Sequence, residues 1–443
     1  MPFPPQPPEV QGLVLSGGGS RASFHIGALR YLYDRVHIAP TCIVGTSAGS
    51  IVGTMLSQWT DGQKQAKGLD ELERIWMSMT GPSDMFVEQA WFSRLRGQWD
   101  DLSDLISQHV VHDVPEESIV ESTTDGTPVE VVMRAMTEDP SQDLTVTPSI
   151  LWQLVGSLAR LGRASAGLAS TVRGAERAAS AYRPGPIVKR MLFESTFKSS
   201  RVTNSGVRLR IAFVDLNSGN LRFMREDGVI VDREDNPVND EQFDVTLGVW
   251  ASCALPGIFR PVKLGSGVYV DGGVRENVPV EMAVTHLGVT KPYVIVAGPP
   301  YNEPGDYTNK DAVALMLRVA NLVLDENIQD EVEWARSAGA CVIQPRVDVH
   351  SSLTVDPVLL SINRDYGWIR AAEEVTGAPK EIQEIDDALI SARCQWAALV
   401  KQPDARGKKT ALNALHRKVR DLLATADPDL LPPDHALWAT HLV

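Results

Sequence analysis

The sequence predicts an α/β fold, in which short buried strands alternate with helices. Two units near the N-terminus indicate this fold: the apolar runs 13–15 and 42–44 each lead through a glycine-rich turn into a helix-like stretch. The same alternation returns after residue 205 and includes a further buried strand at 293–297. Since no run reaches about 18 apolar residues, no transmembrane helix is expected.

The composition is that of a globular protein with a large core. Of 443 residues, 43% are hydrophobic and 22% are charged, which suits one large α/β domain with insertions or about two to three smaller domains. The net charge of −14 argues against nucleic acid as a partner, because phosphate recognition needs a basic face. It also weakens attraction of the whole protein to an anionic membrane.

The N-terminus and the cysteines indicate a reducing compartment. Residues 1–10 are rich in proline, which predicts a disordered leader without the basic and apolar regions of a secretory signal. The four cysteines lie far apart and form no C-x-x-C pair, so neither a disulfide framework nor a zinc site is expected. We therefore expect a cytoplasmic protein that contacts membranes only at their surface.

The first part of the α/β domain spans residues 11–60. A strand is expected at 11–16 and a helix at 21–35, where apolar side chains recur at helical spacing. A second buried strand at 41–45 leads into a helix at 48–59. Small residues at the start of this helix allow it to lie close beneath the turn that precedes it.

Residues 61–204 interrupt this pattern, and we interpret them as a cap inserted over the site. A helix is expected at 69–79, a strand at 126–136 and an apolar helical stripe at 151–181. Residues 151–201 carry nine lysines and arginines and two acidic residues. Such a segment is typical of peripheral contact with an anionic membrane, although glycines within the stripe slightly favour a helix packed on the acidic remainder of the protein.

The alternation of strands and helices resumes near residue 205. Residues 207–214 and 220–225 alternate apolar and polar side chains, which predicts a β-hairpin. The other expected strands are short and lie at 268–270, 293–297 and 341–344. The other expected helices span 243–252, 278–287, 310–338, 357–375 and 382–425. Residues 346–443 therefore form a helical C-terminal region.

Ser47 lies in Gly45-Thr46-Ser47-Ala48-Gly49, a match to the G-x-S-x-G nucleophile elbow. Glycines on both sides allow a sharp strand-to-helix turn that exposes the hydroxyl, and the helix directs the positive end of its dipole at the reacting atom. The same pattern also arises by chance in glycine-rich loops. The apolar strand before Ser47 and the helix after it favour the catalytic interpretation.

A second glycine-rich turn, Gly17-Gly18-Gly19-Ser20-Arg21, follows the first strand. Its N–H groups suit the oxyanion of a tetrahedral intermediate, and Arg21 supports that charge or orients the turn. A dinucleotide fingerprint is a competing interpretation, because Gly17, Gly19 and Ala22 fit G-x-G-x-x-A; however, the second strand ends at a serine and not at a ribose-binding acid. A Walker P-loop is excluded because no Gly-Lys-Ser/Thr follows, and a simple tight turn stays open.

A nucleophilic serine needs a base, and Asp271 at the end of a short strand is a candidate. Gly272 and Gly273 let the chain turn away sharply and leave the carboxylate exposed toward the elbow, although a D-G-G sequence alone is often only a turn. His286 and His350 lie downstream and allow a Ser–Asp–His order as in α/β-hydrolases. A third histidine, His25, is expected to pack within the first helix.

Taken together, these segments resemble the four-part pattern of the patatin-like phospholipases. The turn G-G-G-x-R-G is similar to residues 17–22, with alanine at position 22 in place of the last glycine, and the elbow is residues 45–49. The segment A-S-x-x-x-P-x-x-F-x-P matches Ala251–Pro261 at every specified position. The fourth part matches Asp271-Gly272-Gly273, followed by Asn277-Val278-Pro279.

The resemblance covers residues 11–60 and 205–345. It implies a patatin-type three-layer α/β/α sandwich, with the cap 61–204 and the helical region 346–443 outside the shared pattern. The extra methyl group of Ala22 is the one departure from the motifs, and it could crowd the glycine-rich turn.

The resemblance also implies a mechanism. Ser47 and Asp271 form a catalytic dyad without histidine, and an oxyanion hole is formed by Gly17, Gly18, Gly19 and Arg21. The supporting residues of the elbow and the neighbouring loops are Gly45, Gly49, Pro256, Gly272 and Gly273. The implied substrate is a phospholipid or another lipid ester, cleaved as by a phospholipase A or lysophospholipase, and no metal or cofactor is needed.

Two alternatives from different classes stay open. One is a carboxylesterase with a Ser–Asp–His triad that uses His286 or His350. The other is a lipid-binding module that has lost catalysis, which intact Ser47 and Asp271 argue against. The sequence identifies no protein activator.

Overall fold

The computed structural model describes residues 9–90, 93, 180–194, 197–300, 327–403 and 407–440. The chain divides into two compact units. Unit 1 comprises Met1–Val87, Pro184–Pro256 and Pro261–Val443, and unit 2 comprises Glu88–Arg183 and Gly257–Arg260. The expected leader 1–10, strand 126–136 and helix 151–181 lie wholly or largely outside the described residues.

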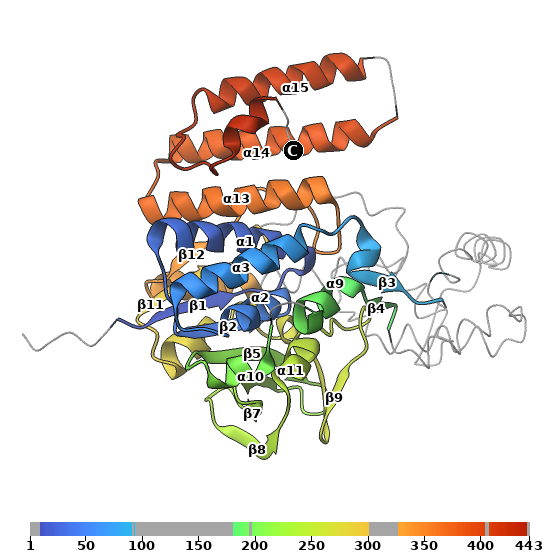
Figure 1. The fold of residues 1–443 in the computed structure, drawn as a ribbon, viewed down its shortest axis with the longest axis vertical. Coiled ribbons are helices and arrows are strands. Elements are labelled where there is room, and N and C mark those ends of the chain that lie inside the picture. Colours follow the sequence, from blue (N-terminus) through green and yellow to red (C-terminus); the bar gives the residue numbers. More distant parts are fainter. Residues whose placement is uncertain are drawn as a thin grey trace, which may run out of the picture. The chain divides into compact units, whose positions relative to one another are not determined.

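A ten-stranded mixed sheet forms the centre of unit 1 (Figure 1). Its strands follow the order β12-β11-β1-β2-β5-β6-β7-β8, and β10 and β9 extend from β5. Neighbours from β12 to β5 are parallel, and the remaining pairs are antiparallel. The bounds are β1 Gln11–Leu15, β2 Cys42–Thr46, β5 Arg208–Asp215, β6 Leu221–Arg225, β7 Val229–Val231, β8 Pro237–Gln242, β9 Val262–Leu264, β10 Gly267–Asp271, β11 Lys291–Ile295 and β12 Cys341–Ile343. A separate two-stranded sheet pairs β3 Phe86–Glu88 with β4 Tyr182–Pro184.

The helices lie before, between and after these strands. The α-helices are α1 Ala22–Tyr31, α2 Ala48–Leu56, α3 Gly62–Trp76, α9 Pro186–Lys189, α10 Ser199–Asn204, α11 Val245–Ser252, α13 Pro357–Thr376, α14 Lys380–Lys401 and α15 Lys408–Leu423. Short 3-10 or π-helices are η1 Gly19–Arg21, η2 Leu32–Val36, η3 Pro82–Asp84, η4 Arg190–Glu194, η5 Gly272–Val274, η6 Met282–His286 and η7 His435–Ala439. Residues 327–337 are also helical.

Helices cover both faces of the sheet in unit 1. On one face α2 lies so close to the strands that a Cβ atom on Gly53 would be 2.9 Å from Ile43 Cγ2. On the other face Val14 and Val44 belong to a buried cluster that includes residues of the segment 278–287 and of the helix 327–337. The strands are therefore buried on both sides, which explains their almost uninterrupted apolar sequences. The three-layer α/β/α fold predicted from the sequence is confirmed.

The arrangement around β5 brings two distant strand ends together. β2 runs parallel to β5 as far as the pair Thr46–Ala212. β10 runs antiparallel to β5 and ends at the pair Asp271–Phe213. Because Ala212 and Phe213 are adjacent, β2 and β10 approach each other head-on along one strand. The residue that follows β2, Ser47, therefore meets the last residue of β10.

The helical C-terminal region predicted for residues 346–443 is confirmed in the described part of the chain. α13 packs against α1, and α14 and α15 lie successively farther from the sheet (Figure 1). Glycines make the first of these contacts close, because a Cβ atom on Gly27 would collide with the carbonyl oxygen of Arg364. A Cβ atom on Gly367 would likewise collide with the carbonyl oxygen of Phe24.

Several predicted elements differ in extent from the observed ones. The hairpin is confirmed as β5 and β6, and α11 lies where a helix is expected. α3 begins at Gly62 and not at 69, because the Asp61 side chain accepts a hydrogen bond from the Lys64 N–H and caps it. α3 lies within the range 61–204 interpreted as a cap, yet it belongs to unit 1.

The strands that the sequence did not predict are short or polar. β7 and β9 have three residues each, and β8 is Pro-Val-Asn-Asp-Glu-Gln, which is largely exposed. Among the described residues, no helix combines the length and the apolar character needed to cross a bilayer.

Candidate active site

Ser47 occupies a strained turn between β2 and α2. Its φ of 52° and ψ of −124° lie in a region that side chains rarely adopt. The turn is tight because a Cβ atom on Gly45 would be 2.7 Å from the Gly49 carbonyl oxygen, and one on Gly49 would collide with that of Leu15. The Ser47 N–H donates to Ser252 Oγ at 2.8 Å. Such an elbow is the geometry predicted from G-x-S-x-G.

The Asp271 carboxyl group lies against this serine. The Gly273 N–H donates a hydrogen bond to it at 2.8 Å, and the neighbouring Ser47 hydroxyl favours its ionised form. Asp271 is only 3% exposed. Burial raises the pKa of Asp271 from 3.8 to about 6, against the opposing effect of these two groups. At neutral pH the group is therefore ionised and is a stronger base than an exposed aspartate.

Neighbouring backbone contacts fix the position of Asp271. Its N–H donates to the Ala254 carbonyl oxygen at 3.1 Å, so the segment Ala251–Pro261 holds the end of β10. Pro256 itself is exposed, two residues beyond that contact. Position 272 requires glycine because the chain passes close to β5 there: a Cβ atom would be 2.6 Å from the Ala212 carbonyl oxygen.

The structure does not bring a histidine to this pair. Among the described residues, no histidine hydrogen-bonds to Ser47 or Asp271. The His350 ring bonds through Nδ1 to the Ser351 carbonyl oxygen at 2.9 Å, and His286 ends the π-helix η6. His25 is fully buried in α1, as expected from the sequence, and burial lowers its pKa to about 3. The geometry therefore gives no support to a triad.

The glycine-rich turn lies beside Ser47, but its N–H groups are not equivalent. The Gly17 N–H donates to Asn277 Oδ1 at 2.9 Å. This bond removes Gly17 from the set of oxyanion donors expected from the sequence; a Cβ atom on it would be 3.2 Å from Ser47 Cβ. Gly18 and Gly19 have no acceptor for their N–H groups among the described residues. These two donors are therefore open to a ligand.

Arg21 is already paired within the protein. Its guanidinium donates to both carboxylate oxygens of Asp348 at 2.9 Å and to the His350 carbonyl oxygen at 2.6 Å. Of the two roles considered for Arg21, this arrangement supports orientation of the turn and not contact with the oxyanion. Ala22, the departure from the motif, is fully buried as the first residue of α1.

Four supporting residues were not predicted as such. Ser252 and Asn277 stand in the motifs, but only the structure assigns them hydrogen bonds to Ser47 and Gly17. Glu331 accepts the N–H groups of Asn277 and Val278 at 2.6–3.2 Å, and burial raises its pKa to about 8. Glu331 and Asp348 lie outside every motif, so no pattern in the sequence could single them out.

Comparisons with known proteins agree with the motifs. A profile described as "Patatin-like phospholipase" matches residues 13–284, more than half of the chain. The uncharacterized protein YqhO of Bacillus subtilis (strain 168) is 35% identical over 86 residues. That match covers 17% of this chain and 28% of the relative, so the chain spans less than two thirds of the length of YqhO.

Solved structures with a detectable likeness are more distant. VipD from Legionella pneumophila is 14% identical, with a TM-score of 0.35, over 95% of this chain and 82% of VipD. A chain of the ExoU–SpcU complex from Pseudomonas aeruginosa is 14% identical, with a TM-score of 0.24, over 96% of this chain and 68% of that one. The family assignment depends on the profile match and not on these structures: the chain belongs to the patatin-like phospholipase family.

Proposed function

We propose that the protein is a serine acyl hydrolase of phospholipids or other lipid esters, of the phospholipase A or lysophospholipase type. One observation carries the proposal: in a chain of this family, β5 brings Ser47 beside Asp271, a buried carboxylate whose pKa burial raises and the Ser47 hydroxyl lowers. A nucleophilic hydroxyl needs such an adjacent base. The strained elbow and the start of α2 support the same role for Ser47.

The acylation step follows from this geometry. Ser47 Oγ attacks the ester carbonyl carbon while Asp271 takes the hydroxyl proton. The carbonyl oxygen becomes an oxyanion, which the N–H groups of Gly18 and Gly19 stabilise. Collapse of the tetrahedral intermediate breaks the ester bond, and Asp271 delivers the proton to the leaving alcohol. One such donor typically contributes about 2.7–4 kcal/mol to transition-state stabilisation.

In deacylation, a water molecule takes the place of Ser47 as the nucleophile. Asp271, ionised again, takes a proton from a water molecule that attacks the acyl-serine. The second oxyanion occupies the same two N–H groups, and the proton returns to Ser47 as the fatty acid leaves. A pKa of about 6 suits a group that accepts and gives back a proton near neutral pH.

Membrane contact and location are further parts of the proposal. In an acidic chain, residues 151–201 carry the excess of basic residues that would meet an anionic bilayer. The four cysteines are free thiols, which suits a cytoplasmic location.

Product analysis tests the function directly. Mixed phospholipid vesicles are incubated with wild-type protein and with Ser47→Ala, and the lipids are analysed by mass spectrometry. We expect free fatty acid and lysophospholipid with wild type only. Labelling by a fluorophosphonate should require Ser47 and Asp271. Lipid turnover that persists in Ser47→Ala would overturn the proposal, and vesicle binding without turnover or labelling would favour a silent lipid-binding module.

A further inference from the structure

The glycine-rich turn is held on one side by a segment far from it in sequence. This segment, Asp348–Ser352, connects β12 to α13 and lies outside the family match. The N–H and the hydroxyl of Ser20 both donate to the Ser352 carbonyl oxygen at 2.9 Å. Arg21 Nη2 donates to both carboxylate oxygens of Asp348 at 2.9 Å. The two residues that follow Gly19 are therefore both fixed by this segment.

Gly19 itself depends on the same contact. It has a φ of 55°, in the left-handed region, and a Cβ atom on it would collide with the Ser352 carbonyl oxygen. The N–H groups of Gly17, Ser20 and Arg21 are all used in hydrogen bonds. The direction of the open Gly18 and Gly19 N–H groups is therefore fixed as long as the residues around them stay in place.

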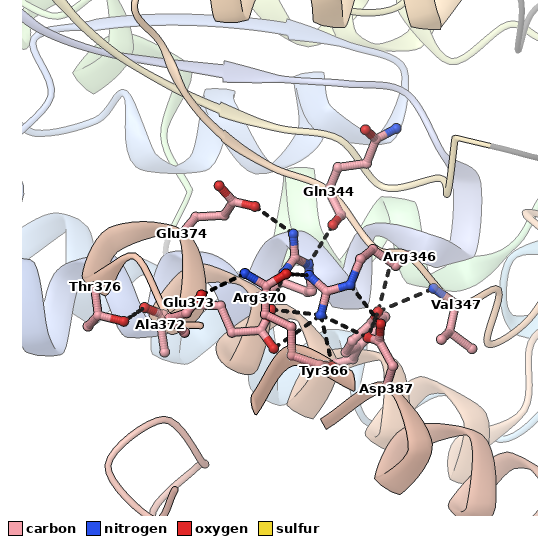
Figure 2. Close-up of polar contacts among 12 residues, drawn as sticks. Gln344, Arg346, Val347, Tyr366, Arg370, Ala372, Glu373, Glu374, Thr376 and Asp387 are labelled. Carbon is pink, nitrogen blue, oxygen red and sulfur yellow. Dashed lines mark hydrogen bonds and ion pairs between the residues drawn. The ribbon is translucent and has the colours of Figure 1, made fainter. Parts of the chain in front are cut away.

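The two residues that precede this segment, Arg346 and Val347, are in turn fixed to the C-terminal helices (Figure 2). Arg346 donates to both carboxylate oxygens of Asp387 at 2.7 and 3.0 Å and to Glu373 at 3.1 Å. The N–H groups of Arg346 and Val347 both donate to the Tyr366 hydroxyl, at 2.9 and 3.2 Å. Asp348 follows directly, so its carboxylate projects from a segment anchored on α13 and α14.

The Arg21–Asp348 pair is suited to a positioning role. The two side chains are 16% and 22% exposed, so water competes with the pair only in part. The contact is charge-assisted, and such hydrogen bonds are about twice as strong as neutral ones. The Arg21 Nε bond to the His350 carbonyl oxygen at 2.6 Å removes the remaining rotational freedom of the guanidinium.

We propose that Asp348 is a positioning residue for acyl transfer: it holds Arg21 and thereby aims the Gly18 and Gly19 N–H groups at the oxyanion. Asp348 touches neither the substrate nor Ser47, and its effect passes through Arg21. The inference deepens the proposed function and rests on it. A displacement of about 1 Å at an active site can cost on the order of a hundredfold in rate.

The test compares Asp348→Asn, Asp348→Glu and Arg21→Lys with a matched control, Asp70→Asn. Asp70 also pairs with an arginine, Arg30, at 2.6 Å, but on α3 away from the turn. With a soluble short-chain ester we expect Asp348→Asn and Arg21→Lys to lower kcat by about tenfold or more, with KM changed by less than about threefold. Asp348→Glu should recover part of kcat, and Asp70→Asn should resemble wild type.

Two further measurements separate positioning from general stability. Amide hydrogen exchange at Ser20 and Arg21 should quicken in Asp348→Asn, while the thermal midpoint stays near that of Asp70→Asn. In the double variant Asp348→Asn/Arg21→Lys, kcat should fall no further than in Arg21→Lys alone. Unchanged exchange, multiplicative losses in kcat, or unchanged kcat despite faster exchange would each overturn the proposal. Failure of the proposed function itself would be seen separately, as turnover and labelling that do not depend on Ser47.

Discussion

At the scale of single residues, the burial of Asp271 has a kinetic consequence. Its pKa of about 6 means that the base is lost by protonation on the acid side of neutrality. We expect kcat/KM for a soluble ester to fall about tenfold per pH unit below pH 6 and to level off above it. The pH dependence of fluorophosphonate labelling should show the same inflection. An inflection near pH 4 would contradict the assignment.

The same shift predicts a cost in stability. Because the pKa of Asp271 is 3.8 ordinarily and about 6 in the folded state, folding favours the protonated carboxyl group. The contribution of Asp271 to the free energy of unfolding should therefore fall as pH rises from about 4 to 6 and stay constant above. Asp271→Asn removes this loss of stability, because asparagine does not ionise. We expect it to be more stable than wild type by on the order of 1–3 kcal/mol at pH 7.5, as measured by urea unfolding, with the gain lost at pH 4.

Ser47 carries strain that a matched pair of inactive variants can measure. Both Ser47→Ala and Ser47→Gly remove the nucleophile, but only glycine adopts a φ of 52° without steric cost. We expect Ser47→Gly to be more stable than Ser47→Ala by about 1 kcal/mol. This difference is the strain energy that glycine relieves, minus the cost of the greater conformational entropy of glycine in the unfolded chain. Thermal unfolding of the two proteins side by side gives the difference. An Ala variant at least as stable as the Gly variant would mean that the elbow is not strained.

At the scale of secondary-structure elements, the α1–α13 contact joins the start of the chain to its C-terminal helices. Gly27→Ala introduces a Cβ atom where the Arg364 carbonyl oxygen lies, and two packed backbones cannot move aside cheaply. We expect it to lower the free energy of unfolding by about 3 kcal/mol. Gly81→Ala is the matched control, because a Cβ atom on Gly81 meets nothing within 4 Å. Equal effects of the two substitutions in denaturant titrations would contradict the predicted contact.

The sequence predicted those elements whose physical cause is local. β1, β2 and the elbow follow from apolar runs and glycines adjacent in the chain, and the hairpin of β5 and β6 follows from alternation. The residues alone make Asp271 a candidate base, and the family resemblance pairs it with Ser47; the approach itself depends on β5 pairing first with β2 and then with β10. No local pattern marks the pairing of Gly17 with Asn277, which joins residues 260 positions apart.

At the scale of the whole molecule, the two ends of the segment Glu88–Arg183 lie close together within unit 2. The Gln89 N–H donates to the Ala181 carbonyl oxygen at 2.9 Å, and its side chain donates to Ser180 Oγ at 2.7 Å. A linker of about six glycine and serine residues can therefore replace residues 92–179 without stretching the chain. We expect unit 1 to fold in this variant, because its sheet and both helix layers are intact.

The linker variant separates membrane contact from chemistry. The replaced residues include four of the nine basic residues of 151–201: Arg160, Arg163, Arg173 and Arg177. Since each basic residue near an anionic surface contributes about 1 kcal/mol, loss of these four should weaken binding to anionic vesicles at least about tenfold. Turnover of a soluble short-chain ester depends on Ser47 and Asp271 and should change far less. A full-length control, with Arg160, Arg163, Arg173 and Arg177 changed to glutamine, should lose vesicle binding in the same way if charge is the cause. Equal losses of binding and soluble turnover in the linker variant would instead mean that residues 92–179 serve the folding of unit 1.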